Sequence, residues 1–394
     1  MNARLALVFA LAIGCVACGE QSNTDPVDPQ NESTPGETTP GNTNTANLET
    51  EAGCDGATFL KGPEDPAEPG PWAVGARTVS IGDLVGEIWY PATPGSDAGI
   101  DKVVYDIREQ LAPSEGAKIS DEKNPWHPCD CYRDLPLDTD RGRYPVIVFV
   151  HGTAGFRHQS LSFMTHWASH GFVVAALDHP GLKLGDLLAF QMNQNLGSDV
   201  ARLVEALDNP TGDLAFLAGA IDMSRLGASG HSAGGGTIRS WGSRAQVLIP
   251  MASGGTDAGE SLKSSLILGG MDDGVAQYSG TKRGYEQTIG NKRLVGLANA
   301  GHLAFSDLCM VGRENGGLVQ IAQEAGVSNA NFASFLWDGC DPDQLPAETG
   351  IEIVKYASTP VLQETLQCRG TKTALLPELP TMFPDVGEYL EAIQ

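Results

Sequence analysis

The stretch Ser224-Arg-Leu-Gly-Ala-Ser-Gly-His-Ser-Ala-Gly-Gly-Gly236 decides the fold of this chain. It contains a G-x-S-x-G pattern, centred on Ser232, that follows a run of mostly small residues. The pattern predicts a strand that turns sharply into a helix and exposes the serine at the bend. The glycines on either side let the two backbones approach without a Cβ clash. Because the chain has 48 glycines, such a match also arises by chance, and the surrounding sequence has to decide.

A serine hydroxyl is a poor nucleophile, so a histidine and a carboxylate are expected to assist Ser232. His302 is the only one of the eight histidines that follows Ser232, and it comes shortly after the apolar run 294–298. The acids between the two are Asp257, Glu260, Asp272, Asp273 and Glu286. Asp272 and Asp273 stand at the tip of a glycine-rich turn that ends a strand-like run. Either can be the triad acid on these grounds, because parallel sheets place chemistry at the carboxyl ends of their strands.

A second apolar run predicts the site that would hold the oxyanion. Residues 145–150 read as a buried parallel strand, and His151-Gly152-Thr153 follows as a loop. The backbone N–H groups of Thr153 and Ala233 are then the expected oxyanion donors. Because these donors are main-chain groups, side-chain changes at the two positions should matter less than a change at Ser232.

The chain alternates between strand and helix patterns. An antiparallel hairpin is predicted over 77–92, and 93–143 is taken as a polar, proline-rich insertion. Strands are then expected at 145–150, 172–178, 225–230, 246–250, 265–269 and 293–298, with helices at 159–169, 198–208 and 233–241. This order predicts an α/β fold: a mostly parallel, doubly wound sheet with helices on both faces. Residues 306–394 read as an extension of helix and loop, with helices at 317–325 and 351–367.

The N-terminus predicts export. Residues 1–18 have a basic start and a 12-residue apolar run, too short to span a bilayer and typical of a signal peptide. Cys15 and Cys18 each follow a small residue, as in a bacterial lipoprotein signal, and both are lipidation candidates. Residues 19–53 are of low complexity and are expected to be a disordered tether, which leaves 54–394 as the folded domain.

Cysteine usage agrees with export. Without Cys15 and Cys18, six remain: Cys54, Cys129, Cys131, Cys309, Cys340 and Cys368. An even number predicts three disulfides, but the sequence does not choose among fifteen pairings. Distant partners are expected for Cys129 and Cys131, rather than a metal. Cys309 is expected to pair within the tail and so pin the loop after His302. No metal or organic cofactor is expected.

These motifs together resemble the α/β-hydrolase superfamily. Within it, the chain resembles a branch that contains platelet-activating-factor acetylhydrolases, dienelactone-hydrolase-like proteins and polyester hydrolases of the cutinase-like type. The matching stretches include Gly86-Glu-Ile-Trp-Tyr-Pro-Ala, Val150-His-Gly-Thr-Ala-Gly-Phe-Arg, Gly230-His-Ser-Ala-Gly-Gly, Gly270-Met-Asp-Asp-Gly-Val and Gly301-His-Leu-Ala-Phe-Ser-Asp. The spacing in the fourth stretch favours Asp273 over Asp272 as the acid. Thr153 and Met251 stand where polyester hydrolases carry aromatic residues, which argues against an aromatic polyester as substrate.

The resemblance implies a serine esterase that acts on a small-molecule or lipid ester. The same motifs leave open an amidase or peptidase, and a catalytically silent surface-binding lipoprotein. A dehalogenase is disfavoured, because that chemistry usually needs an aspartate at the position of Ser232. The net charge of −24 argues against nucleic acid as a partner. The protein is expected to be a monomer that meets the membrane only through its lipid anchor, in the periplasm or at the cell surface, or else to be secreted.

Overall fold

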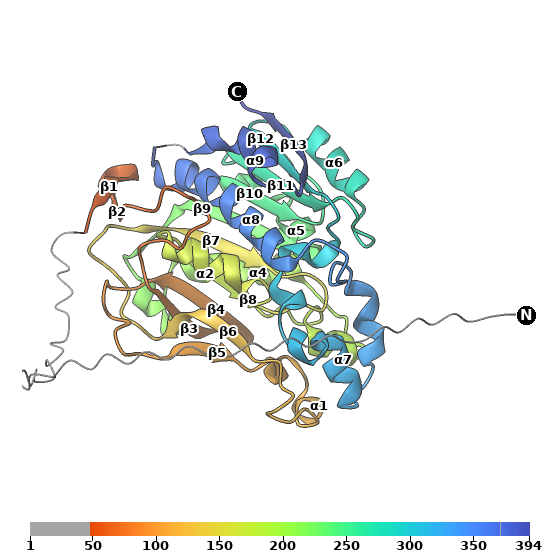
Figure 1. Cartoon of the computed structure of the whole chain (residues 1–394). Helices are drawn as coiled ribbons and strands as arrows, with labels where there is room; N and C mark the ends of the chain where they lie inside the picture. The colour runs from red at the N-terminus through yellow and green to blue at the C-terminus, as the bar shows by residue number, and fades with distance from the viewer. Residues whose placement is uncertain (1–47, 371) are drawn as a thin grey trace, which may run out of the picture. The chain divides into compact units, whose positions relative to one another are not determined.

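The computed structural model describes residues 48–370 and 372–394, and it builds them around one large mixed sheet (Figure 1). The predicted signal peptide, both lipidation candidates and most of the predicted tether therefore lie outside the described residues. Within the described part of the chain, no helix has the length and the apolar character needed to cross a membrane.

The sheet has eleven strands in the order β13-β12-β11-β10-β9-β7-β8-β4-β3-β6-β5. Its central strands, from β8 to β12 in that order, all run parallel. Their neighbours β3 and β4 form the predicted antiparallel hairpin. The strand bounds are β3 Val74–Ile81, β4 Leu84–Pro91, β5 Lys102–Tyr105, β6 His127–Arg133, β7 Tyr144–Val150, β8 Val173–Leu177, β9 Ile221–His231, β10 Val247–Met251, β11 Ser264–Gly270, β12 Lys292–Leu297 and β13 Val386–Ala392.

Helices cover both faces of this sheet, and β7 shows why its sequence is apolar throughout. Val146, Val148 and Val150 belong to one hydrophobic core, whereas Ile147 and Phe149 belong to the other. Successive side chains of a strand point to opposite faces, so a strand buried on both faces needs a continuous apolar run. The first core includes side chains of α4 (Leu196–Asp208) and α5 (Ala233–Ile238), and the second those of α2 (Leu161–Ser169) and α8 (Ala347–Leu362). The doubly wound α/β architecture predicted from the sequence is therefore confirmed.

Five further α-helices lie in connections and in the tail. They are α1 (Pro113–Gly116), α3 (Leu184–Leu188), α6 (Tyr278–Gln287), α7 (Gly317–Glu324) and α9 (Leu379–Met382). The predicted helix over 351–367 starts earlier, as α8, and ends in a single π-helical turn, Gln363–Gln367.

The two outer edges of the sheet differ from the sequence prediction. The insertion 93–143 is not only loop, because β5 and β6 extend the sheet beyond β3. The tail is not only helix and loop, because β13 pairs antiparallel with β12. Both additions cover strands that would otherwise present unpaired backbone groups to solvent.

The folded part also begins a few residues before the predicted boundary at residue 54. β1 (Thr50–Ala52) pairs with β2 (Thr58–Leu60), although its own sequence is polar. Tertiary partners explain the difference: Glu51 forms an ion pair with Arg369, and Cys54 forms a disulfide with Cys368.

Candidate active site

Ser232 lies at a sharp turn between the end of β9 and the start of α5. Its backbone has φ 54° and ψ −119°, a strained conformation for a residue with a side chain. The flanking glycines make this turn possible. A Cβ on Gly234 would lie 2.0 Å from the carbonyl oxygen of Val150, and one on Gly230 would lie 2.5 Å from the carbonyl carbon of Gly234. Any other residue at either position would push the strand and the helix apart.

The structure brings His302 and Asp273 together from two loops at the carboxyl edge of the sheet. His302 opens a short 3₁₀ helix after β12, and its Nδ1 lies 2.9 Å from Oδ2 of Asp273. The other oxygen of Asp273 accepts the backbone N–H groups of Val275 (2.8 Å) and Ala276 (2.6 Å). Both side chains are buried, whereas Asp272 is exposed. The carboxylate accepts a hydrogen bond from the Nδ1–H of His302. This bond fixes the tautomer of the ring and leaves Nε2 free to act as a base.

His231 links this pair to the serine turn. Its Nε2–H donates to the carbonyl oxygen of His302 at 2.9 Å, and the two rings lie 4.7 Å apart. In the described chain, the hydroxyl of Ser232 forms no hydrogen bond with Nε2 of His302. Such contacts are often long in ligand-free hydrolases and tighten when substrate binds.

The loop after β7 packs directly against the serine turn. A Cβ on Gly152 would lie 2.9 Å from Nδ1 of His231 and 3.1 Å from Cβ of Ser232, so glycine allows the loop to approach the serine turn this closely. The backbone N–H groups of Thr153 and Ala233 have no hydrogen-bond acceptor among the described residues. Gln159 supports the loop, because its Oε1 accepts the N–H of Gly152 at 3.1 Å. Two free N–H groups beside a serine are what an oxyanion site requires.

Asp338 holds the loops of Asp273 and His302 together, and the sequence reasoning missed it. Its Oδ2 accepts the backbone N–H of His302 and that of Gly274, both at 2.9 Å. Its own carbonyl oxygen accepts the N–H of Leu303 at 2.8 Å. No motif marks this residue, which lies 36 positions after His302 in the tail. One hint in the sequence indicates that the tail returns to this loop, namely the expected pairing of Cys309 within the tail. The structure has this disulfide between Cys309 and Cys340.

Two other histidines near the site are held neutral. Burial, with a smaller contribution from the neighbouring His302, lowers the pKa of His231 to about 3. Burial likewise lowers the pKa of His151 to about 3, with His179 as the second cause. His151 donates from Nδ1 to the carbonyl oxygen of Gly152 at 2.8 Å and accepts the N–H of His179 at Nε2. These side chains therefore shape the loops and do not compete with His302 for a proton at neutral pH.

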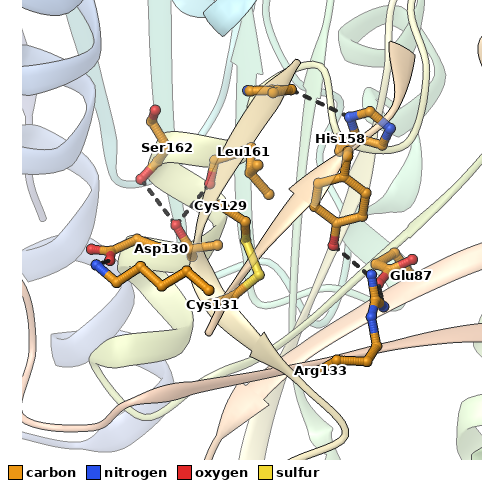
Figure 2. The surroundings of a disulfide bond; sticks show 12 residues. Glu87, Cys129, Asp130, Cys131, Arg133, His158, Leu161 and Ser162 are labelled. Carbon is orange, nitrogen blue, oxygen red and sulfur yellow. Dashed lines mark hydrogen bonds and ion pairs between the residues drawn. A yellow bond between two sulfur atoms is a disulfide. The ribbon is translucent and has the colours of Figure 1, made fainter. Parts of the chain in front are cut away.

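The six described cysteines form three disulfides. Cys309 pairs with Cys340 inside the tail, as expected, and Cys54 pairs with Cys368. The expectation of distant partners for Cys129 and Cys131 is wrong, because these two pair with each other (Figure 2). Residues i and i+2 of a strand share a face, and the two Cα atoms on β6 lie 5.1 Å apart, which suits a disulfide. Among the described residues, no cluster of three or more His, Cys, Asp or Glu side chains is arranged to hold a metal ion.

The strand order, the serine at the turn after β9 and the histidine after β12 define an α/β-hydrolase fold. A solved structure, the ferulic acid esterase from Streptomyces cinnamoneus, matches with a TM-score of 0.55 at 16% sequence identity. The match covers 83% of this chain and 98% of the esterase. Residues 123–181 match the sequence family of platelet-activating factor acetylhydrolase, isoform II. The fold of this chain is therefore of the α/β-hydrolase type, in agreement with the resemblance seen in its motifs.

Proposed function

We propose that this protein is an exported serine hydrolase that cleaves carboxylic esters through an acyl-enzyme. The observation that carries the proposal is the 2.9 Å contact between His302 and Asp273, made beside the strained turn that presents Ser232. The similar solved structure is named an esterase and the matching family is named an acetylhydrolase, which supports an ester as the substrate. Nothing in the site calls for a cofactor in this chemistry.

In the proposed reaction, Ser232 attacks the carbonyl carbon of the ester while Nε2 of His302 takes its proton. The tetrahedral oxyanion then accepts hydrogen bonds from the N–H groups of Thr153 and Ala233. His302 returns the proton to the leaving alcohol, and a water molecule releases the acyl group by the same route. Asp273 keeps the imidazole in one tautomer and stabilises its charged form.

The proposed location is outside the cytoplasm. Three disulfides are consistent with an extracellular protein. We propose that residues 1–18 are a signal peptide that ends in lipidation at Cys18 or Cys15. The following segment would then tether the enzyme, whose folded part starts near residue 48.

Replacing the nucleophile tests the proposal directly. We expect Ser232→Ala to lower kcat for a p-nitrophenyl ester by about 10⁶-fold and to abolish labelling by a fluorophosphonate probe. Ser240→Ala, at an exposed serine just beyond α5, is the matched control and should retain both properties. Near-normal ester turnover by Ser232→Ala would refute the assignment. A matched p-nitroanilide substrate distinguishes an esterase from an amidase, and an unlabelled wild-type protein would indicate a silent binding protein.

A further inference from the structure

A small apolar cavity lies outside the central sheet, between the insertion, α3 and the tail. It has a volume of about 40 Å³. Side chains of all three segments form its wall, and each of them is apolar; they include Ile107, Leu184, Leu188, Ile321, Ala330 and Trp337. The insertion and the tail are therefore joined by a hydrophobic cluster of their own, separate from the two cores of the sheet.

The cavity wall is tied to the proposed oxyanion loop. The backbone N–H of Ala154 donates to the carbonyl oxygen of Leu182 at 2.9 Å, and the N–H of Leu184 donates to that of Gly155 at 3.1 Å. Leu184 itself lines the cavity. Leu184, a residue of the wall, is therefore hydrogen-bonded directly to the segment that follows Thr153.

The wall is tied equally closely to the loop of the proposed base. Trp337 lines the cavity, and the next residue is Asp338, which accepts the N–H of His302. Leu303, directly after His302, belongs to the same hydrophobic cluster as Leu184. The wall of the cavity is thus connected to both loops between which we propose that the substrate binds.

An unfilled apolar space in a packed cluster is unfavourable, because its lining atoms lose contacts. Apolar cavities stay dry and accept small apolar guests. Ala330 also borders an open surface hollow, which is lined by Phe190 and Phe332 together with the polar side chains of Gln323, Asn329 and Asn331. Phe190 is exposed and has a positive φ of 56°, which is strained for an aromatic residue.

We propose that this cavity binds a short hydrocarbon group of the ester substrate and sets the chain length that the enzyme accepts. The inference rests on the proposed esterase function. The hydrocarbon can belong to the acyl group or to the alcohol, since the wall of the cavity is connected to both loops. The small volume favours groups of a few carbon atoms.

Changing the cavity volume tests this inference. Ala322→Leu fills the cavity from a partly exposed position that can relax, and Leu188→Ala enlarges it. Each variant is assayed with p-nitrophenyl esters of increasing acyl length and with alkyl acetates of increasing alcohol length. We expect Ala322→Leu to lower the ratio of kcat/KM for the butanoate ester to kcat/KM for the acetate ester by at least about tenfold. A loss of this size is usual when an apolar pocket no longer has room for about one methylene group. Leu188→Ala should shift the optimum to a longer chain.

The matched control is Ala201→Leu, on the exposed face of α4, which should leave the chain-length profile unchanged. The substrate series that responds identifies the acyl or the alcohol side. Unchanged profiles in both cavity variants, with acetate turnover kept, would overturn the inference while the esterase function stands. If the cavity variants lose acetate turnover and also have a lowered Tm, they are misfolded and do not test the inference. In that case, xenon binding in crystals of Ser232→Ala tests whether the cavity accepts an apolar guest. Xenon in the cavity supports an apolar binding site, and an empty cavity rejects it, whichever way the test of Ser232 turns out.

Discussion

The Asp273 carboxylate uses its two oxygens for two purposes. One oxygen holds the turn through the N–H groups of Val275 and Ala276, and the other faces Nδ1 of His302. We expect Asp273→Asn to lower kcat by about 10⁴-fold, because an amide nitrogen facing Nδ1 favours the wrong tautomer of the histidine. Asp272→Asn, at the exposed neighbour, is the control and should change kcat by less than about twofold. Steady-state kinetics checks both variants, and the reverse result would make Asp272 the acid.

Asp338 is a positioning residue, because it acts on His302 only through the backbone. Asp338→Ala leaves the N–H groups of His302 and Gly274 without their acceptor; the loss costs about 1–3 kcal/mol at the buried His302 and less at the exposed Gly274, whose N–H can bond to water. We expect kcat to fall by about 10- to 100-fold with little change in KM, since the substrate itself loses no contact. Asp338→Asn should restore most of the activity, because its amide oxygen can still accept these bonds. Equal losses in the two variants would contradict this role.

Chain order made some site residues predictable and others not. Ser232 and His302 could be proposed because a motif marks the first and only one histidine follows it. The residues alone left Asp272 and Asp273 open, and only the spacing of the family resemblance favoured Asp273, because the turn decides which of the two side chains is buried. Asp338 could not be found, since a carboxylate that binds distant backbone N–H groups leaves no local pattern. His231 was seen only as the variable position of the motif, although it binds the carbonyl oxygen of His302.

At the scale of elements, α5 shows how neighbouring glycines can have opposite roles. Gly234 packs against β7, where a Cβ would lie 2.0 Å from a backbone oxygen. Gly236, in the same helix, has nothing within 4 Å of the place where its Cβ would be. We expect Gly236→Ala to raise the free energy of unfolding by about 0.5–1 kcal/mol, because alanine is the better helix former. Gly234→Ala should destabilise the protein and remove activity. Urea denaturation checks both, and similar effects of the two changes would contradict this account.

Elements with a strong apolar pattern could be predicted, whereas those that depend on a partner could not. β7 has a continuous apolar run and α4 has one apolar face at helical spacing, and local sequence alone reveals both patterns. Both elements lie close to their predicted positions. β13 has a mixed sequence that becomes a strand because the edge of β12 accepts it. The disulfide within β6 was missed for a related reason: two cysteines separated by one residue can pair only if the backbone places them on one face.

At the scale of the whole molecule, the fold keeps five buried histidines neutral. Burial is the main cause in each case: it lowers the pKa of His170 to about 4 and those of His151 and His231 to about 3, and it holds those of His158 and His166 well below the usual value. Two of the five are His151 and His231 at the site, and the others are His158, His166 and His170. A nearby cation or second histidine adds to the effect for each of them. The fold therefore depends on these side chains staying unprotonated.

This dependence predicts that acid destabilises the protein below about pH 6.5. In the unfolded chain a histidine has a pKa of about 6.5 and takes up a proton there, whereas the folded protein does not until a much lower pH. Each histidine then favours unfolding by about 1.4 kcal/mol for every pH unit, so five of them at pH 5 approach about 10 kcal/mol, comparable to a typical total stability. Denaturant unfolding at pH 5 to 8 should show stability that rises with pH, and His170→Gln should reduce that slope by about one proton. A stability that is flat or falls from pH 5 to 6.5 would contradict the prediction.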